Sequence, residues 1–453
     1  MSNHPLKKLI EKHKKGQTVG IYSVCSANSF VLKAALDYAK HNNSLLLVEA
    51  TSNQVDQFGG YTGMTPYNFR QMVLKLAQET NYDPIGLLIG GDHLGPNRWA
   101  NRPSDEALVN ASEQIAAYVN AGFSKIHLDA TIPLANDQTD DGRLPISVIA
   151  ERTARLCAVA EETFRKNPAL QYSPLYIIGS DVPVPGGARA VLEGVHVTPV
   201  SEVEETISAI QQAFEKFGLQ EAWQRVKAIV VQPGVEFDHQ TVFDYQPTRT
   251  LQLKQFIEQQ PQFVYEAHST DYQTNPALRH LVEDHFAILK VGPALTFAMR
   301  EAVFALAFIE REILALHKGL VASQILETIE QVMIQQPQHW RAHYTGNHAE
   351  QSFARRFSFS DRIRYYWPQQ NIQEALQRLL KNLKQTGIPL TLLSQFLPEE
   401  YRDVRLKQLK NEPQAIILHK IQNRLKDYSV ATRMENSLSW NKTNHNQPIV
   451  ERL

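Results

Sequence analysis

Apolar residues gather in eight short runs over the first two-thirds of the chain, separated by stretches with helical spacing. The runs cover residues 19–26, 44–51, 85–91, 125–131, 175–181, 228–234, 263–269 and 287–293. Between them, apolar positions recur every three or four residues, as in 29–42, 106–122 and 203–218. Strand–helix alternation predicts an α/β protein with a parallel sheet. Eight such units in sequence favour closure into a (β/α)8 TIM barrel. An open doubly wound sheet has the same periodicity and stays as the alternative.

The pattern changes after the eighth apolar run. Residues 293–316 form a long stretch of helical spacing, and no strand-like run follows beyond about residue 320. Residues 371–387 and 412–429 again carry helical spacing. We therefore expect a barrel over residues 1–320 and a helical extension over 321–453 that packs on it. The polar stretch 435–447 is expected to be frayed.

Composition narrows the range of partners and compartments. Lys and Arg number 46 against 47 Asp and Glu, a balance that argues against nucleic acid or an anionic membrane as partner. The two cysteines, Cys25 and Cys157, are too few for a disulfide framework or a thiolate zinc site. No apolar run approaches the ~20 residues of a membrane span, and the basic N-terminal stretch indicates a helix rather than a signal peptide. We expect a cytoplasmic protein. A homo-oligomer is an alternative to a monomer that the composition does not decide.

Polar side chains stand at the carboxyl ends of several apolar runs, where the catalytic groups of such barrels lie. The residues concerned are Glu49, Asp92, His93, His127, Asp129, Glu266, His268 and Lys290. Side chains alternate faces along a strand, so His127 shares a face with Asp129, and Glu266 with His268. A single residue of this kind more often caps a loop or forms a hydrogen bond at a strand end. Together they predict one site, with Asp92, Glu49 and Asp129 as candidate catalytic groups.

Two of the histidines indicate a metal site. His93, in the stretch GGDHLGPN after the third run, and His268, at the end of the seventh, can reach the same space. Neutral imidazole is a common zinc ligand, and a catalytic zinc generally takes three protein ligands. The stretch VVQPGVEFDH after the sixth run offers Glu236 as the third ligand, with His239 as the alternative. The sequence thus predicts a divalent metal, with zinc as the first choice, although an ordinary acidic loop would also explain Glu236.

Longer motifs carry a family resemblance along essentially the whole chain. The stretches GGDHLGPNRW, VVQPGVEFDH, VYEAHSTDYQT, ILKVGPALTF and FSDRIRYYWP resemble the GatZ/KbaZ family, the Z-type subunit of tagatose-1,6-bisphosphate aldolase. The stretches GGDHLGPN, GFSKIHLDAT and VYEAHSTD also resemble the class II zinc-dependent fructose/tagatose-bisphosphate aldolases. That resemblance implies zinc bound by His93 and His268, and proton transfer by Asp92 at the hydroxyl that becomes the aldehyde.

The chain departs from the class II pattern at three places. Glu236 stands near the position of the third zinc-binding histidine, and Val291-Gly292-Pro293 replaces an Asn and Asp that bind substrate. Ser269, Thr270 and Asp271 follow His268 in place of a Gly/Ser-rich phosphate loop, and Asp271 would repel a phosphate. Bisphosphate binding in the usual manner is therefore not expected.

Candidate residues for binding a ketose phosphate lie in three parts of the chain. They are Ser269, Lys290, Arg362 and Arg364. The two arginines belong to the stretch SFSDRIRYYWP at 358–368, and they could clamp a phosphate over the barrel mouth. The alternative is that they form salt bridges and aromatic packing between the extension and the barrel.

The resemblance implies an accessory subunit that is required for full activity and stability of a catalytic Y-type aldolase partner. The alternative is an autonomous metal-dependent ketose phosphate 4-epimerase that works by retro-aldol chemistry. A third hypothesis is a sugar-sensing protein that binds ligand without turnover. The family has also been called a tagatose-6-phosphate kinase. The sequence contains no G-x-x-x-x-G-K-[ST] loop, and PVPGGARA at 183–190 is only a weak glycine pair.

Overall fold

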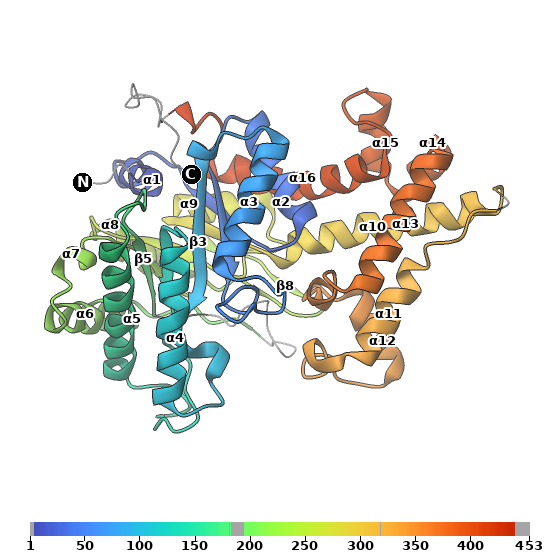
Figure 1. Ribbon diagram of the computed structural model, residues 1–453. Coiled ribbons are helices and arrows are strands. Elements are labelled where there is room, and N and C mark those ends of the chain that lie inside the picture. Colours follow the sequence, from blue (N-terminus) through green and yellow to red (C-terminus); the bar gives the residue numbers. More distant parts are fainter. Residues whose placement is uncertain (1–3, 181, 183–193, 318, 440–453) are drawn as a thin grey trace.

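Eight parallel strands form a closed barrel in the computed structural model, which describes residues 4–180, 182, 194–317 and 319–439 (Figure 1). In barrel order they are β1 (Ile21–Cys25), β2 (Leu46–Thr51), β3 (Leu87–Leu94), β4 (Lys125–Leu128), β5 (Leu175–Gly179), β6 (Val226–Val230), β9 (Val264–Ala267) and β10 (Phe286–Val291). The barrel closes where β10 pairs with β1, with Ile21 opposite Ile288. The predicted TIM barrel is confirmed, and the open doubly wound alternative is wrong.

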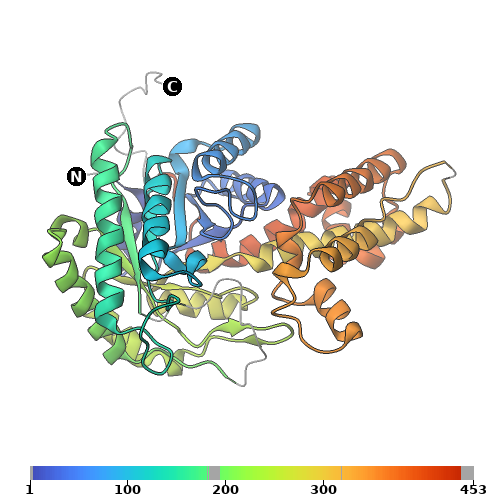
Figure 2. The same ribbon diagram turned by 60° about the horizontal axis from the view of Figure 1, so that its bottom comes forward.

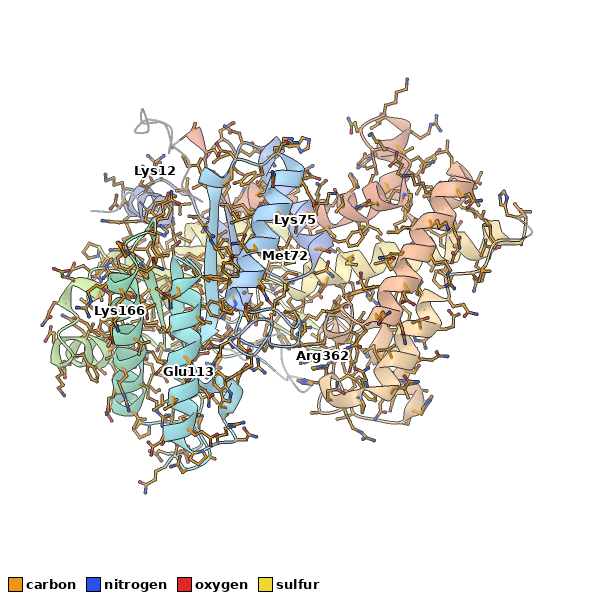
Figure 3. The ribbon with its side chains drawn as sticks, viewed as in Figure 1. Lys12, Met72, Lys75, Glu113, Lys166 and Arg362 are labelled. Atoms are coloured by element: carbon orange, nitrogen blue, oxygen red, sulfur yellow. The ribbon has the colours of Figure 1, made fainter. Side chains whose placement is uncertain are left out.

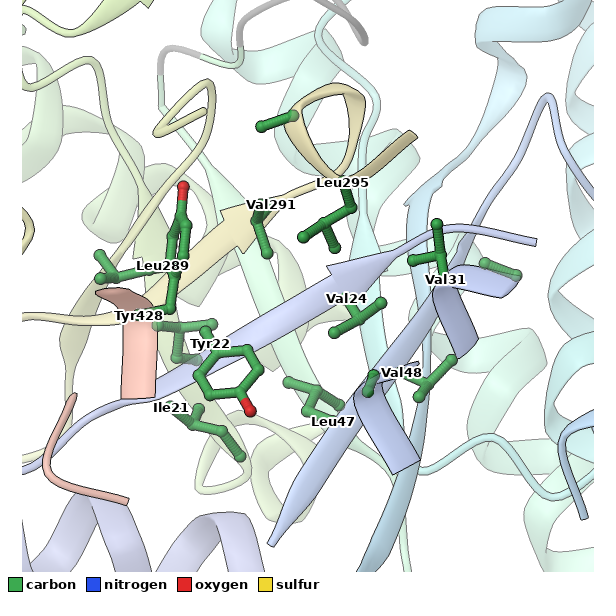
Figure 4. Packing of buried hydrophobic residues seen from close by; sticks show 14 of the residues in the cluster. Ile21, Tyr22, Val24, Val31, Leu47, Val48, Leu289, Val291, Leu295 and Tyr428 are labelled. Carbon is green, nitrogen blue, oxygen red and sulfur yellow. The ribbon is translucent and has the colours of Figure 1, made fainter. Parts of the chain in front are cut away.

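The barrel strands are apolar on both faces because helices cover them from outside. Every residue of β2 and β10 is buried. Figure 4 shows Ile21, Val24, Leu47, Leu289 and Val291 packed around β1 and its two neighbours. Continuous Val, Ile and Leu runs of this kind are typical of parallel strands buried on both sides.

The helical shell follows the strands in order around the barrel (Figure 2). The shell helices and the N-terminal helix are α1 (Pro5–Lys14), α2 (Ser29–His41), α3 (Pro66–Thr80), α4 (Ser104–Asn120), α5 (Ile146–Lys166), α6 (Val200–Lys216), α7 (Gln220–Trp223), α8 (Leu251–Glu258) and α9 (Asn275–Glu283). A small hairpin, β7 (Glu236–Phe237) with β8 (Val242–Phe243), follows β6. Short 3-10 helices cover Pro84–Gly86, Pro96–Trp99, Pro247–Arg249, Pro337–His339 and Arg362–Tyr365.

The extension begins with α10 (Pro293–Leu314), which starts directly after β10 and runs away from the barrel (Figures 1 and 2). It continues through α11 (Ile325–Gln335), α12 (His348–Phe357), α13 (Gln370–Thr386), α14 (Leu390–Phe396) and α15 (Pro398–Arg405). These are the helices seen on the right of Figure 1.

The last helix, α16 (Pro413–Thr432), returns to the barrel and packs against α2, α9 and α10. Its Tyr428 ring lies 6.1 Å from that of Tyr22 on β1, and Thr432 accepts a hydrogen bond from Gly20 N. A segment placed in the predicted extension thus covers the strand that opens the barrel. The division at residue 320 stays a prediction.

Two predicted segments lie wholly or partly outside the described residues. The glycine pair at 183–190 lies outside them, and of the stretch expected to be frayed only residues 435–439 lie inside. Among the described helices, none combines the length and the apolarity needed to cross a bilayer.

Candidate functional site

A local irregularity in β3 directs two consecutive polar side chains toward the barrel interior. The pairing of β3 with β4 shifts register between Gly91 and Leu94, and His93 lies in the left-handed region at φ 50°. Regular strand residues alternate faces, whereas a bulge re-aims a side chain. Asp92 and His93 are therefore both buried and both line the same cavity.

The interior below this bulge holds a network of two lysines and three carboxylates. Lys290 Nζ lies 2.7 Å from Glu49 Oε2 and 2.7 Å from Asp92 Oδ1. Lys125 Nζ lies 2.8 Å from Glu49 Oε1 and 2.8 Å from Glu266 Oε2. Gly90 leaves room for this packing, because a Cβ there would lie 2.9 Å from Glu49 Cγ. Buried charges are tolerated when they are paired in this way.

The network sets the charge of its members. Burial opposes ionisation of Asp92, but His93 and Lys290 hold the pKa of this carboxyl well below its usual range. Burial likewise opposes ionisation of Glu266, and the ammonium groups of Lys125 and Lys290 hold its pKa well below the usual range. The three surrounding carboxylates offset the burial of Lys290 and raise its pKa. Lys290 is therefore a fixed positive charge at the centre of the barrel.

Three histidine rings meet above this network. The ring centroids of His93, His127 and His268 lie 4.9–5.2 Å apart. His93 Nδ1 lies 2.8 Å from Asp129 Oδ2, and Asn97 Nδ2 donates to the same oxygen at 2.7 Å. A carboxylate that holds one ring nitrogen fixes the tautomer and leaves the lone pair of the other nitrogen free to bind a metal. Asp129 thus orients His93.

Four buried residues have the arrangement of a metal-ligand set. Asp92, His127, Glu266 and His268 each offer one ligand atom, and these atoms lie within 4.8 Å of one another. Burial lowers the pKa of His268 to about 3, so its imidazole is neutral. Nε2 of His127 is buried without a hydrogen-bond partner among the described residues. Two imidazoles and two carboxylates suit zinc and similar divalent ions, so the residues present fit a metal.

The predicted metal ligands divide between this group and its surroundings. His268 belongs to the group, and His93 adjoins it with Nε2 3.8 Å from Asp92 Oδ1. Glu236 lies at the start of β7, where it accepts hydrogen bonds from Phe237 N and from the Ser269 side chain. Burial raises the pKa of Glu236 to about 7. Its role as third ligand stays a prediction.

The alternative third ligand, His239, lies at the contact between barrel and extension. Its Nε2 is 2.8 Å from the carbonyl oxygen of His343, and its Nδ1 is 3.2 Å from Ser358 Oγ. The group that could hold an ion is completed by His127 and Glu266. The alternation of strand faces predicts an inward side chain for both residues but no role for either.

A cavity of about 290 Å³ lies over the candidate metal group. Asp92, His93, His268 and Lys290 line its inner part. Its rim comes from barrel loops and from the extension, and includes Asn28, Asn53, Tyr61, Ser269, Asp271, Arg364, Tyr365 and Trp367. The volume lies near the lower end of that of small-molecule sites, roughly 300 Å³.

The two predicted phosphate-binding arginines have different places. Arg364 lines the cavity beside Tyr365, whose ring lies 4.6 Å from that of Tyr61 on the barrel. Arg362 lies at the junction of extension and barrel, with Nη2 2.9 Å from His343 Nδ1 (Figure 3). The extension thus brings one of the two arginines, Arg364, to the cavity over the barrel.

A parallel eight-stranded barrel with buried carboxylates, lysines and histidines at the carboxyl ends of its strands defines a TIM-barrel protein with an enzyme-like polar centre. Comparison with known families then identifies the family of the chain. The chain belongs to the D-tagatose-1,6-bisphosphate aldolase subunit GatZ/KbaZ-like family, whose profile matches residues 6–433.

Solved structures resemble this chain to different degrees. A protein from Sinorhizobium meliloti 1021, described as a probable tagatose 6 phosphate kinase, is 42% identical, with a TM-score of 0.82. The match covers 91% of this chain and 100% of that one. The YdjI aldolase from Escherichia coli K12 is 12% identical, with a TM-score of 0.38 over 83% of this chain and 95% of its own. A putative fructose-1,6-biphosphate aldolase from Coccidioides immitis is 14% identical, with a TM-score of 0.42 over 85% and 98%.

Proposed function

We propose that this chain is the accessory Z-type subunit of a tagatose-1,6-bisphosphate aldolase in the cytoplasm. In this role it binds the catalytic class II aldolase partner and maintains that partner's stability and full activity in tagatose 6-phosphate and galactitol-type catabolism. The family match over residues 6–433 carries the proposal. A subunit that binds only the folded partner stabilises it by mass action.

The test compares the purified Y-type aldolase alone and with this chain. We expect a longer half-life at elevated temperature and a higher specific activity when both are present. The effect should saturate at a fixed stoichiometry, because it depends on complex formation. An unrelated TIM-barrel protein at the same concentration is the control for crowding. Equal half-lives and equal activities with and without the chain would refute the accessory role.

A second function, ketose phosphate 4-epimerisation, is favoured by the buried group of Asp92, His127, Glu266 and His268 below a cavity. An accessory scaffold has no need to keep an intact ligand set. When bound there, a divalent ion would polarise the ketose carbonyl. In this reaction the bond between carbons 3 and 4 breaks, and its electron pair stays on the ketone fragment. The carbon-4 hydroxyl becomes an aldehyde, which rotates before the bond forms again.

The residues of the chain would divide the remaining tasks. Lys290 keeps Asp92 ionised, so the Asp92 oxygen that does not bind the ion can take the proton of the carbon-4 hydroxyl and later return it. Asp129 holds the His93 ring in one orientation. Glu49 Oε2 lies 2.7 Å from Lys290 Nζ and positions that ammonium.

We assign the substrate phosphate to Arg364. Its guanidinium donates to the carbonyl oxygens of Ser360 and Asp361 and to Tyr365 Oη, at 3.1 Å for the last two. The charges of Asp361 and Asp271 act on this guanidinium, but the hydrogen bonds described for it go to carbonyl and hydroxyl oxygens. An arginine at a cavity that is not hydrogen-bonded to a carboxylate is suited to bind a phosphate. Ser269 lines the same cavity and can add a hydroxyl contact.

The epimerase test incubates zinc-loaded protein with fructose 6-phosphate or tagatose 6-phosphate and follows their interconversion by NMR. We expect conversion in both directions, and its loss in His127→Ala and His268→Ala. Lys254→Met, which alters an ion pair with Asp284 outside the cavity, serves as the matched control. No interconversion by the zinc-loaded protein would refute this second function. The description of the S. meliloti protein names a kinase. This sequence contains no P-loop that would support phosphoryl transfer.

A further inference from the structure

The first turn of α10 already has its anionic partners, and both come from the chain itself. Asp271 Oδ1 accepts hydrogen bonds from Gly292 N at 3.0 Å and from Ala294 N at 2.8 Å. Asp361 Oδ2, from the extension, accepts a hydrogen bond from Thr296 Oγ1 at 2.6 Å. The start of a helix is a favourable place for an anion, because its N–H groups and its dipole point toward it. In TIM barrels the loops after the seventh and eighth strands frequently bind a ligand phosphate there.

The Asp271 carboxylate is firmly held in this place. Thr270 Oγ1 donates to the carbonyl oxygen of Lys290 at 2.6 Å, which ties the loop to β10. Tyr428 Oη, on α16, donates to the carbonyl oxygen of Thr270 at 2.7 Å. Asp271 is only 3% exposed, yet it lines the cavity. The carboxylate is therefore a fixed part of the cavity wall rather than a mobile surface group.

The surroundings of Asp271 act on the pKa of its carboxyl in opposite directions. Burial raises the pKa of Asp271 to about 6, and the two backbone hydrogen bonds and Arg364 act against that rise. At neutral pH the group is therefore mainly ionised. A phosphate approaching the same helix start would meet a like charge, and it would have to displace an acceptor that already holds both N–H groups.

We propose that Asp271 is a specificity-determining residue whose carboxylate takes the place of a second ligand phosphate, so that the cavity accepts ketose monophosphates and rejects bisphosphates. The inference rests on the proposed ligand class, with the single phosphate at Arg364. It adds that the excluded position is the start of α10, and that one side chain excludes it.

The first experiment measures the affinity for inorganic phosphate by calorimetric titration. Asp271→Ser removes the charge and frees Gly292 N and Ala294 N, and we expect it to bind phosphate at least about tenfold more tightly than the wild type. Asp271→Asn keeps an acceptor oxygen and removes only the charge, so its gain should be smaller. Asp284→Asn, which removes a buried carboxylate outside the cavity, should match the wild type.

The second experiment compares fructose 6-phosphate with fructose 1,6-bisphosphate on the same proteins. The preference for the monophosphate should shift toward the bisphosphate by at least about tenfold in Asp271→Ser. Unchanged phosphate affinity in folded Asp271→Ser and Asp271→Asn would overturn the inference. A phosphate gain in these variants without sugar-phosphate binding by any protein would support the role of Asp271 and contradict the proposed ligand class.

Discussion

Replacing Lys290 with methionine tests whether the barrel centre is built around a cation. The Lys290 ammonium contacts Glu49 and Asp92 at 2.7 Å and lies 3.5 Å from Glu266, and its side chain is 6% exposed. Without it, the ammonium of Lys125 would contact only Glu49 and Glu266, and Asp92 would lose the lysine that it contacts. Removing one partner of a buried ion pair costs about 3–5 kcal/mol. We expect Lys290→Met to lower the free energy of unfolding by that amount when the protein is kept metal-free with EDTA.

The same substitution should respond strongly to a divalent cation. A ligand that binds only the folded state at ~1,000 times its Kd adds about 4 kcal/mol, which would offset most of the loss. Removing the ammonium beside Asp92 should also tighten metal binding, since like charges repel. The assay is urea unfolding followed by circular dichroism, with EDTA and with zinc.

A surface lysine provides the matched control for this assay. Lys166 Nζ lies 2.6 Å from Glu162 Oε1, and both side chains are more than half exposed, so Lys166→Met should cost less than about 1 kcal/mol. The reasoning would be refuted if Lys290→Met lost no more stability than Lys166→Met in EDTA. It would also be refuted if zinc did not raise the urea midpoint of Lys290→Met.

Three further predictions concern single side chains. Asp129→Asn leaves a hydrogen-bond partner for His93 but removes the charge that orients it, and should weaken zinc binding about 10- to 100-fold in a competitive chelator titration. Arg364→Lys replaces a planar fork with a point charge, and should raise the Kd for fructose 6-phosphate about tenfold in calorimetry, with little change in the urea midpoint. Burial lowers the pKa of His4 to about 3, below the unfolded value of 6.5. The neutral, buried imidazole therefore contributes its full stability above pH 6.5, and this contribution is lost as the pH falls toward 3. His4→Gln should therefore flatten the fall of the urea midpoint between pH 7 and pH 4, and an unchanged slope would contradict this.

The barrel could be predicted from the sequence because a strand that is buried on both faces requires a nearly continuous run of apolar residues. Eight Val-, Ile- and Leu-rich runs separated by helical spacing correspond to eight barrel strands. The place of α16 could not be predicted in this way. Its apolar positions indicate a helix, but nothing local indicates that it returns past α10 to cover β1. The contact between Tyr428 and Tyr22 joins positions far apart in the chain, and local periodicity does not report such a pairing.

The centre of the site shows a different limit of sequence reasoning. Strict alternation assigns Asp92 and His93 to opposite faces, and only the register shift and the left-handed backbone at His93 bring both inside. His127 and Glu266 were within reach of the alternation rule, since each shares an inward face with a residue already singled out. The alternation rule alone does not distinguish them from Glu236 and His239 on the sixth-strand rim, because it gives the face of a side chain and not its distance from His268.

Arg364 and Asp271 show how the two kinds of information combine. The residue type alone indicates that Asp271 repels phosphate, but its function depends on two N–H groups of α10, which lie on another element. Arg364 belongs to a stretch some seventy residues beyond the last barrel strand, and it reaches the cavity only because the extension folds back over the mouth. A barrel truncated after α10 would lose the proposed phosphate anchor and keep the carboxylate that repels phosphate. For this reason the extension belongs to the proposed binding site as much as the strands do.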